Sequence, residues 1–152
     1  MITIQRSKTA DTRTCDVSEV SKEQLLLSSY QHIQDVAKGM QFFANKLLEA
    51  ANSHDHDKFS GIDQFHADFK TKFERTGWWD NHRKVNRHHL LAEDGVPEDV
   101  NLVDVFDMIV DCVMAGMGRS GSVYPLEIKP EVLKDAFDNT VELLKSQVVV
   151  AG

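Results

Sequence analysis

Apolar residues at helical spacing are the feature that most constrains the fold of this chain. Ser21 and Gln24 form the pattern of a capping box, which marks a helix start. From residue 25 onward the apolar residues recur every three or four positions: Leu25, Leu26, Ile33, Val36, Met40, Phe43, Leu47 and Leu48. This spacing predicts one helix up to about Asn52, with Gly39 as a candidate kink or break.

Further helical patterns follow along the chain. Phe65, Phe69 and Phe73 stand four residues apart and predict a second helix that packs into the core and ends at Thr76-Gly77. The segment 78–91 has room for a short helix. Asn101 is a good N-cap for an apolar helix that we expect to end in the loop 116–121. Pro130 suits the first position of the last helix.

No segment between these patterns alternates in the way of a strand. The sequence therefore predicts an all-α fold, a bundle of four to six helices. We expect residues 1–17 to be a flexible N-terminal arm and residues 18–152 to form a single domain, a reasonable size for one hydrophobic core.

Charge and hydropathy exclude some classes of partner. The net charge of −7 argues against binding to duplex nucleic acid, which needs a basic face. No apolar run reaches the roughly 18 residues of a membrane span. Two cysteines are too few for a disulfide framework. We expect a cytoplasmic protein that can still bind a small anion through a metal ion.

The histidines are clustered. Six of the seven lie within 36 residues, namely His54, His56, His66, His82, His88 and His89. Imidazole and carboxylate together are the donors of a transition-metal or magnesium site. His54 and Asp55 are adjacent at the expected end of the first helix, and His32 lies near the middle of that helix. Asp111 shares a helix face with Asp104 and Asp107, which we interpret as solvated or outer residues. We interpret His66 as a surface residue.

The order of these residues resembles the signature of the HD-domain phosphohydrolases, His…His-Asp-x-x-Lys…Asp. It is more closely similar to a family of small, mostly uncharacterised bacterial and phage proteins with a His-Asp-x-Ser-Lys-Phe run and a Trp-x-x-His-x-x-x-Asn-x-His-His segment. The matching residues, between positions 32 and about 114, are His32-Ile33, His54-Asp55, Lys58-Phe59, Trp79, His82, Asn86, His88, His89 and Asp111. His56-Asp57 is a competing register for the His-Asp pair, but only His54-Asp55 leaves Lys58 at the signature position.

The resemblance implies an HD-like helical domain with one or two divalent ions, of Mn, Mg, Fe, Co or Zn. His32, His54, Asp55 and Asp111 would hold one ion, and His82 with either His88 or His89 would hold a second. Asp55 and Lys58 would be the catalytic residues, with Lys58 positioning the phosphate of the substrate. Further phosphate contacts are expected from Arg83, Arg87 and Arg119, and Tyr124, Trp78 or Trp79 could stack on a base, although packing is the commoner role of such tryptophans.

Two functions from different classes remain open. The first is a metal-dependent phosphohydrolase acting on a small phosphorylated substrate, with a nucleotide expected, in the cytoplasm or in the host cytoplasm if the protein is phage-encoded. The second is a non-catalytic, metal-containing helical protein that binds a nucleotide or a protein partner. A third reading is a structural bundle in which the histidines are incidental. The exposed helix faces would allow a homo-oligomer.

Overall fold

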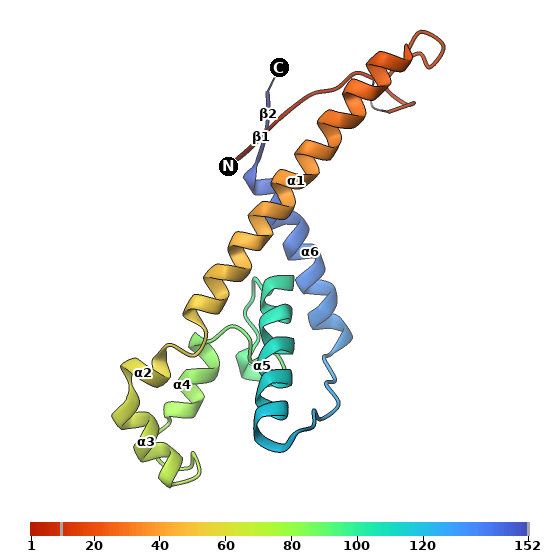
Figure 1. Ribbon diagram of the computed structural model, residues 1–152. Coiled ribbons are helices and arrows are strands. Elements are labelled where there is room, and N and C mark those ends of the chain that lie inside the picture. The colour runs from red at the N-terminus through yellow and green to blue at the C-terminus, as the bar shows by residue number, and fades with distance from the viewer. Residues whose placement is uncertain (10, 152) are drawn as a thin grey trace. The chain divides into compact units, whose positions relative to one another are not determined.

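Helices make up most of this protein. The computed structural model describes residues 1–9 and 11–151, and 62% of these residues are helical (Figure 1). The predicted all-α class is confirmed. The elements in chain order are β1 (Ile2–Gln5), α1 (Lys22–Ser53), α2 (Asp57–Ser60), α3 (Ile62–Lys70), α4 (Trp78–Val85), the 3-10 turn η1 (Glu93–Gly95), α5 (Leu102–Ser120), α6 (Pro130–Gln147) and β2 (Val148–Ala151).

Helix α1 begins where its cap predicts. The Ser21 backbone N–H donates to Gln24 Oε1 (2.9 Å), and the Gln24 N–H donates back to Ser21 Oγ (3.2 Å). The helix runs without a break through Gly39, so the expected kink is absent. A Cβ at Gly39 would meet the Leu144 side chain at an ordinary 3.9 Å, so no turn or close approach there requires glycine.

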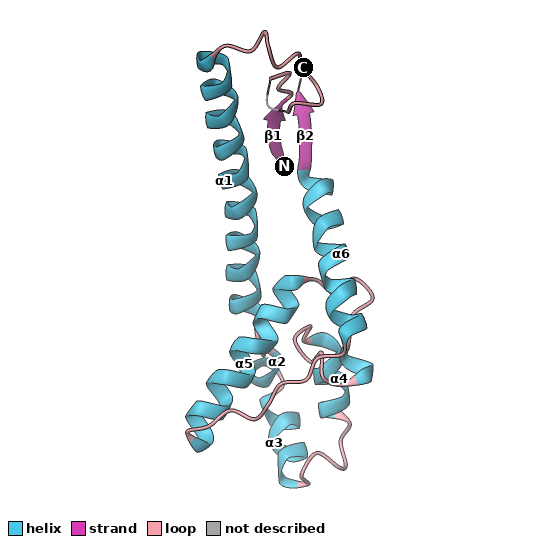
Figure 2. Cartoon of the chain, turned by 90° about the vertical axis from the view of Figure 1, so that its right-hand side faces the viewer, coloured by secondary structure: helices cyan, strands magenta, loops and turns pink. Residues whose placement is uncertain are grey.

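The short sheet was not expected from the sequence. β1 pairs in parallel with β2, with Ile2 opposite Val148 and Gln5 opposite Ala151 (Figure 2). Each strand has only four residues, which is too short for alternation to stand out, and the two strands come from opposite ends of the chain. Residues 2–5 of the expected arm are therefore hydrogen-bonded to the strand that follows α6.

The chain divides into two compact units at positions other than the expected boundary at residue 17. One unit comprises Met1–Asn45 with Glu142–Gly152, and the other comprises Lys46–Val141. In the first unit, α1 holds β1 through side chains: Gln31 Nε2 donates to the Gln5 carbonyl (2.7 Å) and Lys38 Nζ to the Thr3 carbonyl (3.0 Å).

The second unit contains a small apolar core. Its buried members are Leu90, Val100, Val105, Met108 and Ala136. They come from the segment after α4 and from α5 and α6, which fixes the N-terminal half of α5 in place. The predicted cap of α5 is confirmed, because Asn101 Oδ1 accepts from the Val103 N–H (3.0 Å) and Asp104 accepts from the Asn101 N–H (2.9 Å).

Two helix ends differ from those predicted. α3 ends at Lys70 because Lys72 and Phe73 adopt positive φ, and the buried Asp68 carboxylate accepts from the Thr76 N–H (2.9 Å) and Trp79 N–H (3.1 Å). Phe69, which was expected to pack into the core, is 61% exposed and contacts only the edges of Phe65 and Phe73 among the aromatic rings. Helix α5 continues through the glycines to Ser120 and ends at Gly121, whose φ is +74°.

Candidate metal centre

The first two residues of the site, His54 and Asp55, directly follow the C-terminal end of α1. The helix ends at Ser53, and Asp55 then adopts a left-handed conformation with a φ of +53°. Aspartate tolerates this region better than most residues. Asn86 Oδ1 accepts from the Asp55 N–H (3.1 Å), which holds the reversed backbone. A non-glycine residue held at positive φ by such a bond is typical of functional sites.

Histidine and aspartate side chains of the second unit converge here in two groups. His54, Asp55, His88 and Asp111 form one group, and Asp55, His82 and His89 form the other. Within each group the ligand atoms all lie within 4.8 Å of one another. Asp55 belongs to both groups. The arrangement therefore has the donor set for two neighbouring cations that share one carboxylate.

Unpartnered polar atoms are the strongest sign that a cation belongs in this cluster. Among the described residues, the buried side-chain atoms without a hydrogen-bond partner are Asp55 Oδ1 and the Nε2 atoms of His82, His88 and His89. Asp55 Oδ1 lies 3.3 Å from His82 Nε2 and 3.5 Å from His88 Nε2. Each unsatisfied buried group costs about 1–3 kcal/mol. A bound cation would satisfy all four at once, so the residues fit a metal.

Carboxylates behind the rings set the tautomers of three histidines. The Nδ1 atom of His54 lies 2.8 Å from Asp107 Oδ1, and that of His82 lies 2.8 Å from Asp57 Oδ2. The other oxygen of Asp107 lies 3.5 Å from His88 Nδ1. An anionic acceptor at Nδ1 keeps the proton on that nitrogen, so the Nε2 lone pair is left facing the cluster.

Asp57 and Asn86 act together behind His82, in roles that the sequence did not reveal. Asn86 Nδ2 donates to Asp57 Oδ1 (2.9 Å), while Oδ1 of the same side-chain amide accepts from the Asp55 N–H. One buried amide thus links the carboxylate behind His82 to the ligand carboxylate of Asp55. The place of Asn86 within the His-rich segment was the available signal for this role.

Charges in the cluster suit a metal ligand set. Burial would raise the pKa of Asp55, but the nearby His82 ring and the ammonium of Lys58, which donates to Asp55, outweigh it and hold this pKa well below its usual value. Burial would also raise the pKa of Asp107, but the neighbouring His88 and His54 outweigh this effect and lower the pKa. Burial and then the neighbouring His88 and His82 lower the pKa of His89 to about 4. Anionic carboxylates and a neutral imidazole are the forms that bind metals.

Aromatic rings enclose the histidines. The ring centroid of His82 lies 4.6 Å from that of Trp78 and 5.1 Å from that of Trp79, both in stacked geometry. Trp79 also contacts His89 edge to face. His82 is 0% exposed. Both tryptophans therefore contact the ligand rings directly and fix their orientation, in agreement with the packing role expected for them.

Two of the expected phosphate-binding cations border the cluster. Lys58 Nζ forms an ion pair with Asp55 Oδ2, so its charge lies beside both ligand groups. Arg83 lines a cavity of about 340 Å³ together with His88, His89 and Asp111. The Arg83 guanidinium also pairs with Asp94 (2.8 Å) and the exposed Asp80 (3.0 Å).

The other expected substrate contacts lie elsewhere. Arg87 donates from Nε to Asp104 (2.8 Å) and from another nitrogen to Asp99 (2.9 Å), and these bonds raise its pKa. Its guanidinium is paired at the start of α5, and the phosphate role expected of it stays a prediction. Arg119 lies eight residues after Asp111 in α5, which is about 12 Å along the helix axis at 1.5 Å per residue. Tyr124 follows the end of α5, and its side chain is 82% exposed. Neither is brought to the cluster.

His32 is also absent from both ligand groups. It lies in the first unit and borders a cavity beside Gln5 and Arg6. All residues of both groups belong to the second unit, so His32 is not among the residues that the structure brings together there. His89 takes part in the second group and His88 in the first, so both members of the pair are used.

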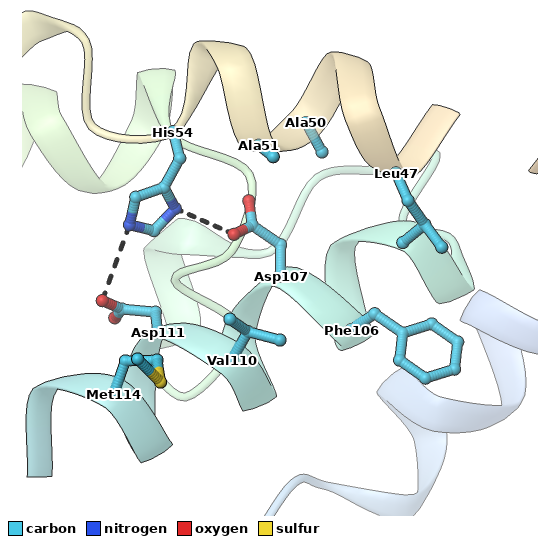
Figure 3. Close-up of a pocket in the computed structure, with 9 residues that line it drawn as sticks. All are labelled: Leu47, Ala50, Ala51, His54, Phe106, Asp107, Val110, Asp111 and Met114. Carbon is cyan, nitrogen blue, oxygen red and sulfur yellow. Dashed lines mark hydrogen bonds and ion pairs between the residues drawn. The ribbon is translucent and has the colours of Figure 1, made fainter. Parts of the chain in front are cut away.

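An apolar cavity opens beside His54 and Asp111. It has a volume of about 550 Å³, and Figure 3 shows its lining from α1 and α5. The residues that line it are Leu47, Ala50, Ala51, His54, Phe106, Asp107, Val110, Asp111 and Met114. His54 points from the α1 side toward Asp107 and Asp111 of α5, with Nε2 3.6 Å from Asp111 Oδ1. The histidine and aspartate cluster thus forms the polar end of an otherwise apolar pocket.

His56 and His66 are exposed and lie outside both groups. Of the two registers for the His-Asp pair, the one that begins at His54 supplies both of its residues to the cluster. The search for relatives found no matching protein family, no matching curated protein and no matching solved structure. No helix in the described ranges is long and apolar enough to cross a membrane.

Proposed function

We propose that this protein is a metal-dependent phosphohydrolase of the HD type, acting on a nucleotide or another small phosphate ester. The observation that carries the proposal is the convergence of four buried, unpartnered atoms from Asp55, His82, His88 and His89. An apolar core would not keep such atoms unpaired without a cation to bind them. Mixed imidazole and carboxylate donors suit ions such as Zn, Fe and Mn.

The two ligand groups have different parts in this proposal. His54, Asp55, His88 and Asp111 hold one ion, and Asp55, His82 and His89 hold the other. When bound, two such ions supply Lewis acidity and a water that ionises near neutral pH. Three protein ligands in the second group leave coordination positions for water and substrate.

Side chains around the centre would position the substrate. Lys58, paired with Asp55, is close enough to the shared carboxylate to attract and orient a phosphate. Arg83 offers a second cation on the wall of the cavity that His88 and His89 also line. The apolar cavity beside His54 would take the organic part of the substrate and exclude water from it.

A non-catalytic metal protein is the second candidate. The group of His54, Asp55, His88 and Asp111 has four ligands, which is the number found in closed structural zinc sites. If only this group were loaded, the ion would stabilise the fold and leave no position for a substrate. The number of ions per chain therefore separates the two candidates.

The test combines elemental analysis with a phosphatase screen. We expect up to two transition-metal ions per chain and hydrolysis of nucleotide monophosphates or a chromogenic phosphate ester with Mn, Mg or Co added. His82→Ala should lose the second ion and the activity. His66→Ala, an exposed histidine outside the cluster, is the matched control and should lose neither. A protein that takes up no metal and stays inactive with every ion would refute the proposal. One bound ion without activity would favour the second candidate.

A further inference from the structure

The apolar cavity beside His54 is built entirely from residues of the second unit, in and just after the last turns of α1 and in α5. Its polar residues do not extend to its far end (Figure 3). His54 and Asp111 lie at one end, and Leu47 and Phe106 lie at the other. Leu47 precedes His54 by seven residues, which is about 10 Å along a helix. A bound group that begins at the cluster can therefore extend about 10 Å over apolar side chains.

Few polar atoms of this cavity are free to bind a ligand. Six of the nine lining residues have apolar side chains, and the three polar ones are His54, Asp107 and Asp111. Asp107 is paired with two histidines, since one oxygen lies 2.8 Å from His54 Nδ1 and the other lies 3.5 Å from His88 Nδ1. His54 and Asp111 are themselves candidate metal ligands. The backbone groups of α5 are bonded within the helix. A ligand in this cavity therefore finds almost no hydrogen-bond partners.

A nucleoside is poorly matched to such a cavity. Its sugar hydroxyls and the polar edge of its base are hydrogen-bonded to water before binding and need new partners afterwards. Each polar group that is buried without a partner weakens binding by a factor of about 5–150. A hydrocarbon group loses no hydrogen bond on entering, and it gains up to about fourfold in affinity for each methylene group that leaves water. The walls of the cavity therefore select against a nucleoside and in favour of a hydrocarbon group.

The cavity also disfavours a negatively charged group. Among the described residues that line it, the carboxylates are Asp107 and Asp111, and neither a lysine nor an arginine is present. A phosphate group placed there would be repelled by both carboxylates. Arg83 lines the neighbouring cavity of about 340 Å³ instead, and Asp111 lines both cavities. The phosphate of a substrate is therefore best placed on the side of Arg83, with the organic group in the apolar cavity.

We propose that the substrates are phosphate monoesters of apolar alcohols, with a short alkyl or aryl group in the cavity beside His54. The inference rests on the proposed phosphohydrolase function and narrows it, because it replaces the nucleotide by an ester whose organic group needs no hydrogen bonds. In the reaction the bond between phosphorus and the ester oxygen breaks, and a bond from phosphorus to the oxygen of water forms. One proton of that water goes to the alcohol oxygen. The products are the apolar alcohol and inorganic phosphate.

The first experiment measures binding rather than turnover. Methyl-, butyl- and hexylphosphonate, whose carbon–phosphorus bond this reaction does not cleave, are titrated calorimetrically into the full chain with Mn added. The dissociation constant should fall at least about tenfold from methylphosphonate to hexylphosphonate, because each added methylene group leaves water. Adenosine 5′-monophosphate should bind within about threefold of methylphosphonate, because its nucleoside gains no partners. Equal constants along the series, or adenosine monophosphate that binds more tightly than hexylphosphonate, would overturn the proposal.

Two variants with matched controls test whether the preference comes from this cavity. Met114→Gln places an amide on its wall, and Ala50→Leu fills part of it. Each should reduce the preference for hexylphosphonate over methylphosphonate at least about fivefold. Met117→Gln and Asn52→Leu introduce the same residues at exposed positions outside the lining and should leave the preference unchanged. Metal content, measured on the same samples, shows whether the metal centre is intact. A preference that survives both cavity variants would refute the placement of the hydrocarbon group.

The last experiment separates this inference from the proposed function. 1-Hexanol, which is uncharged, is titrated into the protein with and without metal, and the methyl NMR signals of the methionines are followed. The signal of Met114 should shift and that of Met117 should not, because Met114 lines the cavity and Met117 does not. A shift at Met114 without hydrolysis of hexyl phosphate would reject the phosphohydrolase function and support the apolar site. Faster hydrolysis of adenosine monophosphate than of hexyl phosphate, or an unchanged Met114 signal, would reject the inference and leave the function standing.

Discussion

Asp57 offers the sharpest test of the proposed metal centre because its carboxylate contacts a candidate ligand, His82, without being a candidate ligand itself. Its carboxylate lies 2.8 Å from Nδ1 of His82. Because His82 is 0% exposed, water cannot take the place of this carboxylate as the partner of Nδ1. In Asp57→Asn the charge is lost, and an amide nitrogen facing Nδ1 would favour the tautomer that carries its proton on Nε2. That proton would occupy the lone pair that faces Asp55.

The expected size of the effect follows from comparable ligand-supporting carboxylates. Removal of such a partner weakens metal binding by about 10–100-fold, or about 1.4–2.7 kcal/mol. At a fixed excess of metal, the stabilisation that metal gives the folded protein should fall by the same amount.

The assay is a competitive chelator titration, supported by thermal unfolding with and without metal. Asp63→Asn, an exposed aspartate of α3, is the matched control and should change neither measurement. The metal-free stability of both variants is measured first, so that a general loss of folding is not mistaken for a loss of affinity. An Asp57→Asn protein that binds metal within twofold of the wild type would refute the reasoning that places Asp57 behind a ligand.

Three further predictions follow from the same geometry. A chelator should lower the unfolding temperature of protein purified with its metal, because the freed cluster leaves four buried atoms unpaired; an unchanged temperature would contradict a bound cation. Lys58→Ala should retain metal within about twofold yet reduce phosphatase turnover at least tenfold, about 1.4 kcal/mol in the barrier, and unchanged turnover would remove its phosphate role. Arg87→Ala should lower the free energy of unfolding by about 1–3 kcal/mol in urea titrations, because it leaves the nearly buried Asp104 carboxylate without its cation. Metal content should stay the same, and a loss of metal would contradict a purely structural role of Arg87.

Local features of the sequence predicted the helices well. The capping boxes at Ser21 and Asn101 and the proline at position 130 act within one turn of chain, so their effects could be predicted without knowledge of the fold. The early end of α3 could not be predicted, because it depends on a buried carboxylate, Asp68, that binds backbone groups eight and eleven residues away.

The sequence by itself determined the helical class and the set of candidate ligands, since periodicity and clustered histidines are both local properties. The resemblance divided the candidate ligands between two ions, but it left open whether His88 or His89 belongs with His82 and did not place His88 with His54 and Asp111. Only the tertiary structure decided that Asp55 is shared, that Asp57 and Asp107 support the rings, and that Arg87 serves the fold. It also left His32 outside both groups, in the first unit, because the spacing of a motif along the chain does not say which compact unit a residue joins.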